Sequence, residues 1–160
     1  MRISMLIGPR PVCLIGTWDE RNKRTNLMTA SFVMPVSFAP SYVAFAVAPS
    51  RYTWELLKEV PEFTINMLTN VQEEISEICG SYSGRDVDKF KEANITPVKS
   101  EKIKPHWVKE CPVAAECMVE FTKLFGDHYI VVGKIVAEHI NNTDYKPLLH
   151  WSGMRYETTR

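Results

Sequence analysis

The chain has 160 residues, of which 45% are hydrophobic, and this composition suits one domain, residues 1–160, with a full core. Lysine plus arginine equals aspartate plus glutamate at 19 each, so no net charge attracts the chain to nucleic acid or to an anionic membrane. We therefore expect neither a nucleic-acid partner nor a membrane partner. A chain with little net charge is also weakly protected against self-association.

The termini and cysteines add expectations about the compartment. The N-terminal apolar run is too short for a signal peptide, and no later segment reaches the roughly 18 apolar residues of a membrane span. The four cysteines form no C-x-x-C pair and are expected to be reduced thiols. We expect a cytoplasmic protein. We expect no metal site, because His106, His139 and His150 show no ligand spacing with one another or with the cysteines.

The first half of the chain is predicted to form strands with one short helix. Residues 12–18 are predicted to form a strand, and residues 19–24 a polar hairpin loop. Residues 26–38 and 42–48 are apolar, strand-like runs that carry small hydroxyl residues. A helical pattern follows them and ends before Pro61.

Small side chains in the first of these runs leave room for a flat ligand. Thr29, Ala30 and Ser31 let a large planar ring approach the backbone and bond to its N–H groups and to two hydroxyls. An ordinary half-buried strand is the structural alternative.

The turn at residues 50–53 has the composition of an anion site. Here the chain leaves a strand and enters a helix, whose free N–H groups and positive dipole end favour an anion. Arg51 adds a planar cationic donor that suits a phosphate. The alternative is that Ser50 or Thr53 simply caps the helix.

The second half is predicted to begin with a strand and helices. Residues 62–68 are predicted to form the strand, and residues 70–73 have the form of a capping box before a helix. Residues 80–85 are predicted to be a loop, residues 86–93 a short amphipathic turn, and residues 95–107 an irregular surface excursion. The apolar face of the helix comprises Val71, Ile75, Ile78 and Cys79.

A long hairpin is predicted to follow. From Val113 to Phe121 apolar residues alternate, with Glu116 among the residues opposite. The turn at residues 126–128 leads to a returning strand at residues 129–139, and residues 146–151 are predicted to form a last short strand. His128, in that turn, is either a plain surface histidine or a site residue at a barrel mouth.

Short motifs occur along the chain in an order that resembles the flavin reductase-like family of FMN-binding split-barrel proteins, which includes flavoredoxin and archaeal ferric reductases. The resemblance covers roughly residues 8–151. The motifs are Arg10-Pro11-Val12, Asn26 to Phe32, Val36-Ser37 with Pro40, Ser50 to Thr53, Phe63 to Asn66, Val87 to Phe90, Glu116-Cys117 and Gly126-Asp127-His128.

This resemblance implies a mainly β fold, a split β-barrel of Greek-key type with a few short helices, assembled as a homodimer with FMN at the dimer interface. It implies a flavoprotein oxidoreductase in which bound FMN, with FAD the less favoured alternative, takes a hydride from NADH or NADPH as a transient donor. The electrons then pass to another flavin, a ferric chelate or a redox protein partner.

The resemblance also implies roles for individual residues. His128 faces the donor or acceptor and is the candidate catalytic residue, while Ser50, Arg51 and Thr53 hold the phosphate. The candidate cofactor-binding residues are Asn26, Met28, Thr29, Ala30, Ser31, Ser50, Arg51, Tyr52, Thr53, Ser81, Ser83, Gly84, Lys89 and Phe90. Asn26 has a turn-closing role as its alternative.

Two other functions stay open on the sequence. No Gly-x-Gly-x-x-Gly element is present, so NAD(P)H has no dinucleotide fold of its own and would lie briefly over the flavin. An electron carrier like flavoredoxin would hold FMN without nicotinamide turnover. A non-catalytic flavin-binding module would turn over no donor.

Overall fold

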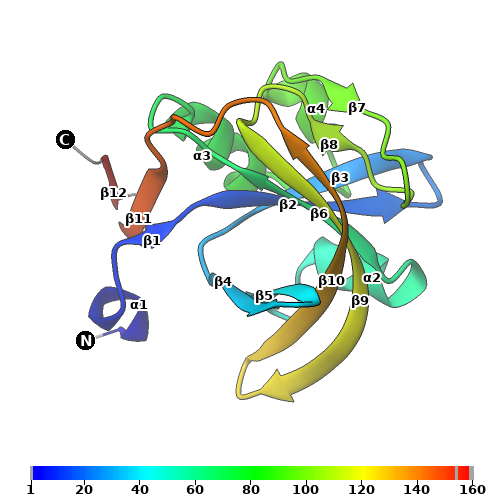
Figure 1. The fold of residues 1–160 in the computed structure, drawn as a ribbon, viewed down its shortest axis with the longest axis horizontal. Coiled ribbons are helices and arrows are strands. Elements are labelled where there is room, and N and C mark those ends of the chain that lie inside the picture. Colours follow the sequence, from blue (N-terminus) through cyan, green and yellow to red (C-terminus); the bar gives the residue numbers. More distant parts are fainter. Residues whose placement is uncertain (1, 154, 159–160) are drawn as a thin grey trace.

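A computed structural model describes residues 2–153 and 155–158, so the expected domain boundaries at residues 1 and 160 lie outside the described residues. Strands dominate the architecture and short helices cover parts of its surface (Figure 1). This confirms the mainly β fold that the sequence predicts. The helices are α1 (Ile3–Leu6), α2 (Tyr52–Glu59), α3 (Glu73–Ser81) and α4 (Lys89–Glu92).

Seven antiparallel strands form the main sheet, in the order β3-β2-β6-β9-β10-β5-β4. Its longest strands, β9 and β10, form the predicted hairpin, which projects from the body of the molecule (Figure 1). The seven strands are β2 (Cys13–Asp19), β3 (Arg24–Ala30), β4 (Val33–Phe38), β5 (Ser41–Val47), β6 (Glu62–Met67), β9 (Val113–Phe125) and β10 (His128–Ile140).

Two small sheets complete the fold. One has the order β1-β11-β12 and lies beside α1, so the N-terminal and C-terminal segments are neighbours (Figure 1). The predicted last strand is present as β11, but a further strand follows it. The remaining strands are β1 (Arg10–Pro11), β7 (Pro97–Val98), β8 (Trp107–Val108), β11 (Leu148–Ser152) and β12 (Arg155–Thr158).

The main sheet curls into an open barrel. Strands β3 and β4 lie at opposite edges of the sheet, yet only Ser31 and Phe32 separate them in the chain. Three residue steps span at most about 10 Å, so the two edges must lie close together. No ladder joins β3 to β4 among the described residues, and the barrel is therefore split at this seam.

The predicted single strand at residues 26–38 is wrong in this respect. The chain pairs with β2 up to Ala30 and with β5 from Val33, so Ser31 and Phe32 cross the seam instead of continuing a strand. Apolar alternation does not reveal which neighbour a strand pairs with, and the break was invisible for that reason. The small hydroxyl side chain of Ser31 consequently lies at the opening of the barrel.

The core has two parts because β2 is buried on both faces. Cys13 and Ile15 point into the barrel, where Phe45 and Phe63 meet edge to face with centroids 5.0 Å apart. Leu14 points to the other side, into a second cluster covered by α3 and α4. Successive strand residues face opposite sides, so a continuous apolar run is what a strand between two cores requires.

The predicted capping box does not form. Helix α3 begins at Glu73, and no side chain caps it among the described residues. Residues before it are tied elsewhere: Asn70 N–H bonds to the carbonyl of Lys146, and the Gln72 side chain accepts from the Thr69 N–H. Val71, expected on the apolar face, is 83% exposed.

The excursion at residues 95–107 is more ordered than predicted. A two-residue ladder joins β7 to β8, and Glu116 on β9 accepts hydrogen bonds of 2.8 Å from the N–H groups of Glu101 and Lys102. Glu116 is fully buried and also contacts His139 Nε2 at 2.7 Å. This loop therefore covers the polar face of β9 at Glu116.

All four cysteines are buried, and none lies in a disulfide. Among the described residues, no group of histidine, cysteine and acidic side chains is arranged to hold a metal. None of the described helices is long and apolar enough to cross a bilayer.

Candidate functional site

A cleft of about 180 Å³ opens between β3, the start of α2 and the segment that follows α3. It gathers most of the residues that the sequence singled out. The predicted residues that line it are Asn26, Met28, Thr29, Ser50, Arg51, Tyr52, Thr53, Ser81, Ser83, Gly84 and Lys89. Cys79, Gly80, Tyr82 and Arg85 complete the lining.

The first turn of α2 presents free donors to this cleft. Arg51 is the N-cap residue in an extended conformation, and no side chain of the described residues bonds to this helix end. The Tyr52 and Thr53 N–H groups lie in the first turn, where a helix offers no acceptor. The capping alternative is thus not realised, since Thr53 lies inside the helix and its Oγ1 accepts from Asn26 Nδ2 at 3.3 Å.

Asn26 leaves one buried acceptor without a donor. Its side chain is 5% exposed, and Oδ1 has no hydrogen-bond partner among the described residues. Strand pairing with Thr17 fixes the backbone of Asn26, and the bond to Thr53 orients its amide. A buried acceptor without a donor costs about 1–3 kcal/mol, so a ligand donor at this point would be favourable.

Lys89 places a buried cation at the same cleft. Its side chain is 5% exposed, and Nζ donates to the carbonyl oxygen of Cys79 at 2.7 Å. Burial lowers the pKa of Lys89 to about 8, nearby Cys79 opposes that shift, and the positive charge of Arg51 adds to it. The lining contains Arg51, Arg85 and Lys89 and no acidic residue among those described, so the cleft suits an anion.

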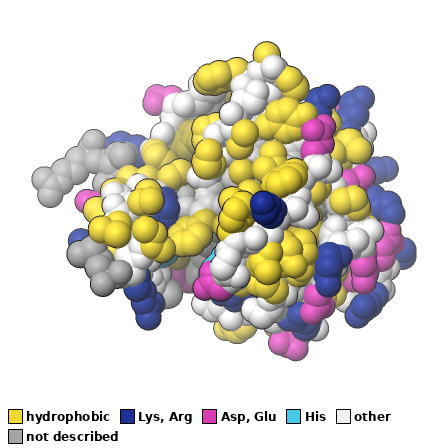
Figure 2. Space-filling view, turned by 90° about the horizontal axis from the view of Figure 1, so that it is seen from below, with side chains coloured by type: hydrophobic (Ala, Val, Ile, Leu, Met, Phe, Trp, Pro, Cys, Tyr) yellow, Lys and Arg dark blue, Asp and Glu magenta, His cyan; other side chains and the backbone are white. Residues whose placement is uncertain are grey.

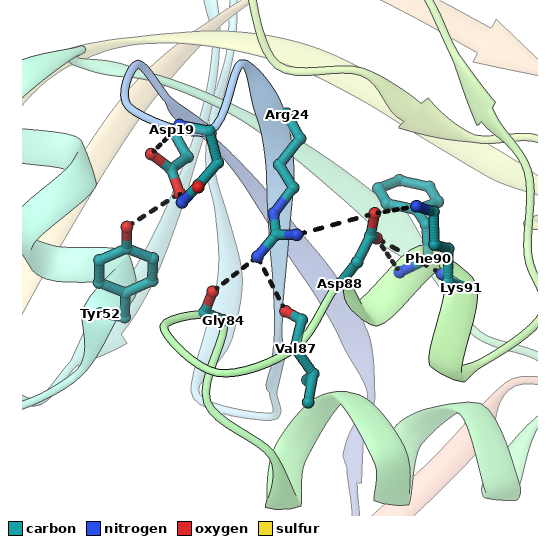
Figure 3. Close-up of polar contacts among 9 residues, drawn as sticks. Asp19, Arg24, Tyr52, Gly84, Val87, Asp88, Phe90 and Lys91 are labelled. Carbon is teal, nitrogen blue, oxygen red and sulfur yellow. Dashed lines mark hydrogen bonds and ion pairs between the residues drawn. The ribbon is translucent and has the colours of Figure 1, made fainter.

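Arg24 on β3 fastens the segment that forms one wall of the cleft (Figure 3). Its Nη2 donates to the carbonyl oxygens of Gly84 at 3.1 Å and Val87 at 3.2 Å, and Nη1 lies 3.9 Å from Asp88 Oδ2. Asp88 in turn caps α4 by accepting from the N–H groups of Phe90 and Lys91. The segment between α3 and α4 is therefore anchored before any ligand binds.

A glycine is required where this segment crosses Asn26. A Cβ at Gly84 would lie 1.9 Å from Asn26 Oδ1 and 3.2 Å from the Tyr52 ring. Tyr52 is itself held, because its hydroxyl donates to Asp19 Oδ2 at 2.9 Å. Close backbone approach at Gly84 keeps the cleft narrow over Asn26.

A second cavity of about 160 Å³ continues the cleft across the seam of the barrel. It shares Met28, Thr29 and Arg51 with the cleft and adds Ala30, Ser31 and His128. Its remaining lining residues are Phe32, Ala46, Val47 and Ala48. Residues of β3 and β5 form two of its walls.

His128 lies at this second cavity, at the first residue of β10. Its Nδ1 bonds to Asp127 Oδ1 at 2.7 Å, and its ring tilts against Phe32 with centroids 5.9 Å apart. The contact with His128 lowers the pKa of Asp127. The imidazole therefore has one nitrogen engaged and the other available for a bound molecule.

Phe90 is the predicted site residue that the structure places elsewhere. Its ring is 6% exposed and packs in the second core cluster, away from the lining of both cavities. Lys89 and Phe90 are neighbours on α4 and face different surroundings. Phe90 is therefore not part of the cleft. The sequence motif could not show this, because it does not say which way each side chain points.

Sequence reasoning missed Arg24 and Arg85. Arg85 lies over the Tyr52 ring at 4.9 Å and pairs with Glu55. Arg24 bonds to residues 60 and 63 positions away, so no local pattern announces it. The only signal was its place at the start of a strand whose later residues line the site.

Fold and site together define a split-barrel protein with a cleft lined by cationic side chains beside the seam of the barrel. Residues 5–159 match the model of the flavin reductase like domain, so the chain belongs to that family. An uncharacterized protein of Archaeoglobus fulgidus is 36% identical over 127 residues, which cover 76% of this chain and 68% of that protein.

Two better described proteins are also similar. A flavin reductase of Pseudomonas putida is 27% identical over 146 residues, which cover 91% of this chain and 81% of that protein. The structure of flavoredoxin from Desulfovibrio vulgaris (Miyazaki F) superimposes with a TM-score of 0.85 at 25% identity, covering 96% of this chain and 88% of that one.

Proposed function

We propose that this chain is a flavoprotein oxidoreductase that binds FMN non-covalently in the cleft and the adjoining cavity. The observation that carries the proposal is the convergence of Lys89, Arg51 and the open end of α2 on one cleft without acidic residues among those described. A phosphomonoester carries about two negative charges at neutral pH and accepts several hydrogen bonds. It is the part of FMN that such a cleft fits.

The residues present fit the rest of FMN as well. Asn26 Oδ1 is a buried acceptor that lacks a donor among the described residues, and a ribityl hydroxyl would supply one. Thr29, Ala30 and Ser31 are small and line the second cavity, where a planar ring can lie against the backbone. Ser81 and Ser83 add hydroxyls at the phosphate end. Arg51 and these hydroxyls also suit FAD, and we favour FMN from the family resemblance.

Neither cavity of one chain is large enough by itself for the whole cofactor. Each is well below the roughly 300–1,000 Å³ of a typical ligand site. We propose that a second copy of the chain supplies the missing wall, in a homodimer built from one FMN-binding domain per chain. A larger apolar cavity of about 400 Å³, lined by Phe32, Met34 and Ile130, lies open next to the ring end and belongs to the surface that the copy would cover.

Exposed apolar residues support the dimer. Phe38 is 98% exposed, and hydrophobic side chains gather around a single cationic one on the face seen in Figure 2. A monomer seldom leaves so many large apolar side chains in water. The exposed large hydrophobic residues on β4, β9 and β10 are Met34, Val36, Phe38, Met118, Phe121, Leu124, Phe125, Ile130 and Ile140.

The chain's own residues hold the cofactor, neutralise its phosphate and fix the wall of the cleft. Bound FMN would supply the redox chemistry for electron transfer from NADH or NADPH to another flavin, a ferric chelate or a protein. Lys89 and Arg51 neutralise the phosphate, and Arg24 holds the wall that carries Ser83 and Gly84. His128 stands at the ring end, where its free nitrogen contacts the donor or acceptor.

The test is anaerobic reduction of the FMN-loaded protein. NADH or NADPH should bleach the visible flavin spectrum within one turnover, and His128→Ala should slow that reduction while FMN stays bound. Glu138→Ala is the control, because Glu138 is exposed on the same strand and lies outside the lining of both cavities. Bound FMN that stays oxidised with both nucleotides would contradict the nicotinamide-dependent activity.

The similarity to flavoredoxin favours one second candidate, an electron carrier with bound FMN and no nicotinamide turnover. The same experiment separates the two. A carrier would be reduced quickly by a low-potential redox protein such as a ferredoxin and would remain oxidised with NADH and NADPH. An oxidoreductase would be reduced by at least one nucleotide.

A further inference from the structure

The small sheet β1-β11-β12 reaches the site through two hydroxyl residues. His150 on β11 lies with Nδ1 3.0 Å from Ser31 Oγ, which belongs to the seam of the barrel. Tyr156 on β12 lies with its hydroxyl 2.9 Å from Ser76 Oγ, and the carbonyl of Ser76 accepts from Thr29 Oγ1 at 2.6 Å. Ser31 and Thr29 both line the second cavity.

The hydrogen bonds around His150 fix which atom donates. Nε2 of His150 lies 2.7 Å from the carbonyl oxygen of Gly153, and a carbonyl can only accept. Nε2 therefore carries the proton of the neutral ring, and Nδ1 is left as an acceptor. Ser31 must then donate its hydroxyl proton to His150.

Among the described residues, the charged neighbours of His150 do not compete for this bond. Arg10 lies opposite His150 on β1, but its Nη2 donates to the carbonyl of Trp151, and its Nη1 bonds to the carbonyls of Ser4 and Ile7. Glu157 on β12 accepts from the Trp151 indole. The Tyr156 ring tilts against His150 with centroids 5.3 Å apart and holds the imidazole in place.

With their protons directed away from the cavity, Ser31 and Thr29 offer only lone pairs to a bound molecule. Thr29 is committed to the Ser76 carbonyl in the same way as Ser31 is committed to His150. A flavin ring gains N–H donors when it is reduced, whereas the same nitrogens are acceptors when it is oxidised. A hydroxyl that only accepts complements the reduced ring and donates no hydrogen bond to the oxidised ring.

We propose that His150 is a positioning residue that sets the polarity of Ser31 and so biases the site toward reduced FMN. This inference rests on the proposed function, because it needs FMN to bind in the cavity. The sheet at the C-terminal end acts through one hydrogen bond across 119 positions of sequence. No contact between His150 and the cofactor is required.

The experiment compares the midpoint potential of bound FMN in the unmodified chain and in His150→Phe, which keeps a ring against Tyr156 and removes the acceptor. Freed from His150, Ser31 can donate, so the preference for reduced over oxidised FMN should fall about tenfold, which is about 30 mV for a two-electron couple. The potential should become more negative. In a Ser31→Ala background the same substitution should leave the potential unchanged.

Two outcomes overturn the inference while FMN binding stands. One is an unchanged potential in His150→Phe, and the other is an equal shift in the Ser31→Ala background, which would mark a purely structural effect of the sheet.

If His150→Phe fails to fold, heteronuclear NMR of the unmodified chain near pH 8, where free histidine is neutral, decides instead. A proton on Nε2 is expected, and a proton on Nδ1 would overturn the assignment. Absence of any FMN binding would instead contradict the proposed function itself.

Discussion

Lys89 donates a hydrogen bond of 2.7 Å to the carbonyl oxygen of Cys79, and this carbonyl is the partner that the structure gives its buried ammonium group. An unpaired buried charge lowers stability unless something compensates it. The cleft in front of it also holds Arg51. The arrangement is costly for the empty chain and favourable for a chain with a bound phosphate.

Replacing Lys89 by Met tests this trade. FMN should bind about 10- to 100-fold more weakly, because a charge-assisted bond contributes about 1.5–3 kcal/mol. The empty variant should unfold at the same or a higher urea concentration, since the buried charge is gone. Lys91→Met is the matched control, as Lys91 is on the same helix with its side chain 85% exposed. Equal losses of FMN affinity in both variants would contradict the assignment.

The pH dependence of FMN binding follows from the same lysine. Burial lowers the pKa of Lys89 to about 8 in the free protein. Between about pH 7, where the phosphate carries about two negative charges, and about pH 8 the affinity should therefore be constant. It should fall as the pH rises further, because the neutral amine attracts phosphate less. Fluorescence titrations across this range measure it, and Lys89→Met should flatten the profile.

The stability of the empty chain should change in the opposite direction over that range. A lysine whose folded pKa lies below its unfolded value binds fewer protons when folded, so stability rises with pH between the two values. For Lys89 this window runs from about 8 to the ordinary lysine value of 10.5. Urea midpoints should show a smaller rise in Lys89→Met, and an identical rise would place the titration elsewhere.

Replacing Arg24 should separate an effect on FMN binding from an effect on overall folding. Arg24→Met removes the bonds to Gly84 and Val87 and the ion pair with Asp88 (Figure 3). The segment between α3 and α4 should then be cleaved faster by a protease, and FMN affinity should fall about tenfold. Arg21→Met is the control, because the Arg21 side chain is 74% exposed and its one ion pair among the described residues is with Glu59. Unchanged proteolysis of this segment in Arg24→Met would show that the anchor lies elsewhere.

Replacing Glu116 should lower the stability of the fold and leave FMN binding unchanged. Its buried carboxylate accepts from two backbone N–H groups and contacts His139, so Glu116→Gln should lower the free energy of unfolding by about 3 kcal/mol or more. FMN affinity should be retained. Glu120→Gln is the control on the same strand, since Glu120 is exposed and its side chain, within the part of the chain that the structure describes, accepts only from Tyr42.

The loss of stability caused by Glu116→Gln should vanish in acid. Burial alone would raise the pKa of this carboxyl, but the hydrogen bonds from Glu101, His139 and Lys102 outweigh it and lower the pKa below the ordinary value. A carboxyl with a lowered folded pKa contributes stability above its unfolded value of about 4.3 and loses it as the pH falls through the folded value. Urea unfolding from pH 7 down to pH 3 should show the two proteins converging, and a constant gap would contradict the ionised state.

Local pattern predicted the elements well and their neighbours poorly. The alternation from Val113 and the turn before His128 gave the long hairpin, and the turn before Tyr52 gave α2. Both depend on contacts near in sequence. The break at Ser31 and Phe32 depends instead on how a seven-stranded sheet curls, which apolar periodicity does not encode.

The candidate site was predictable where small or charged residues cluster and where the family resemblance applies. Arg51, Lys89 and Gly84 do line the cleft together, while Phe90 packs in the core. The positioning contacts were not predictable. Arg24 and His150 each act on a segment more than 50 residues away, so only the folded chain brings them to their partners.

The central claim is that the cleft recognises the phosphate of FMN, and the most direct measurement compares FMN with riboflavin, which lacks that phosphate. Equilibrium titration of the empty protein, followed by flavin fluorescence, gives both dissociation constants. Our account predicts that FMN binds at least about 100-fold more tightly than riboflavin, because two cations and a helix end face the phosphate. It also predicts that Lys89→Met removes much of that difference. Equal affinity for the two flavins would contradict the account.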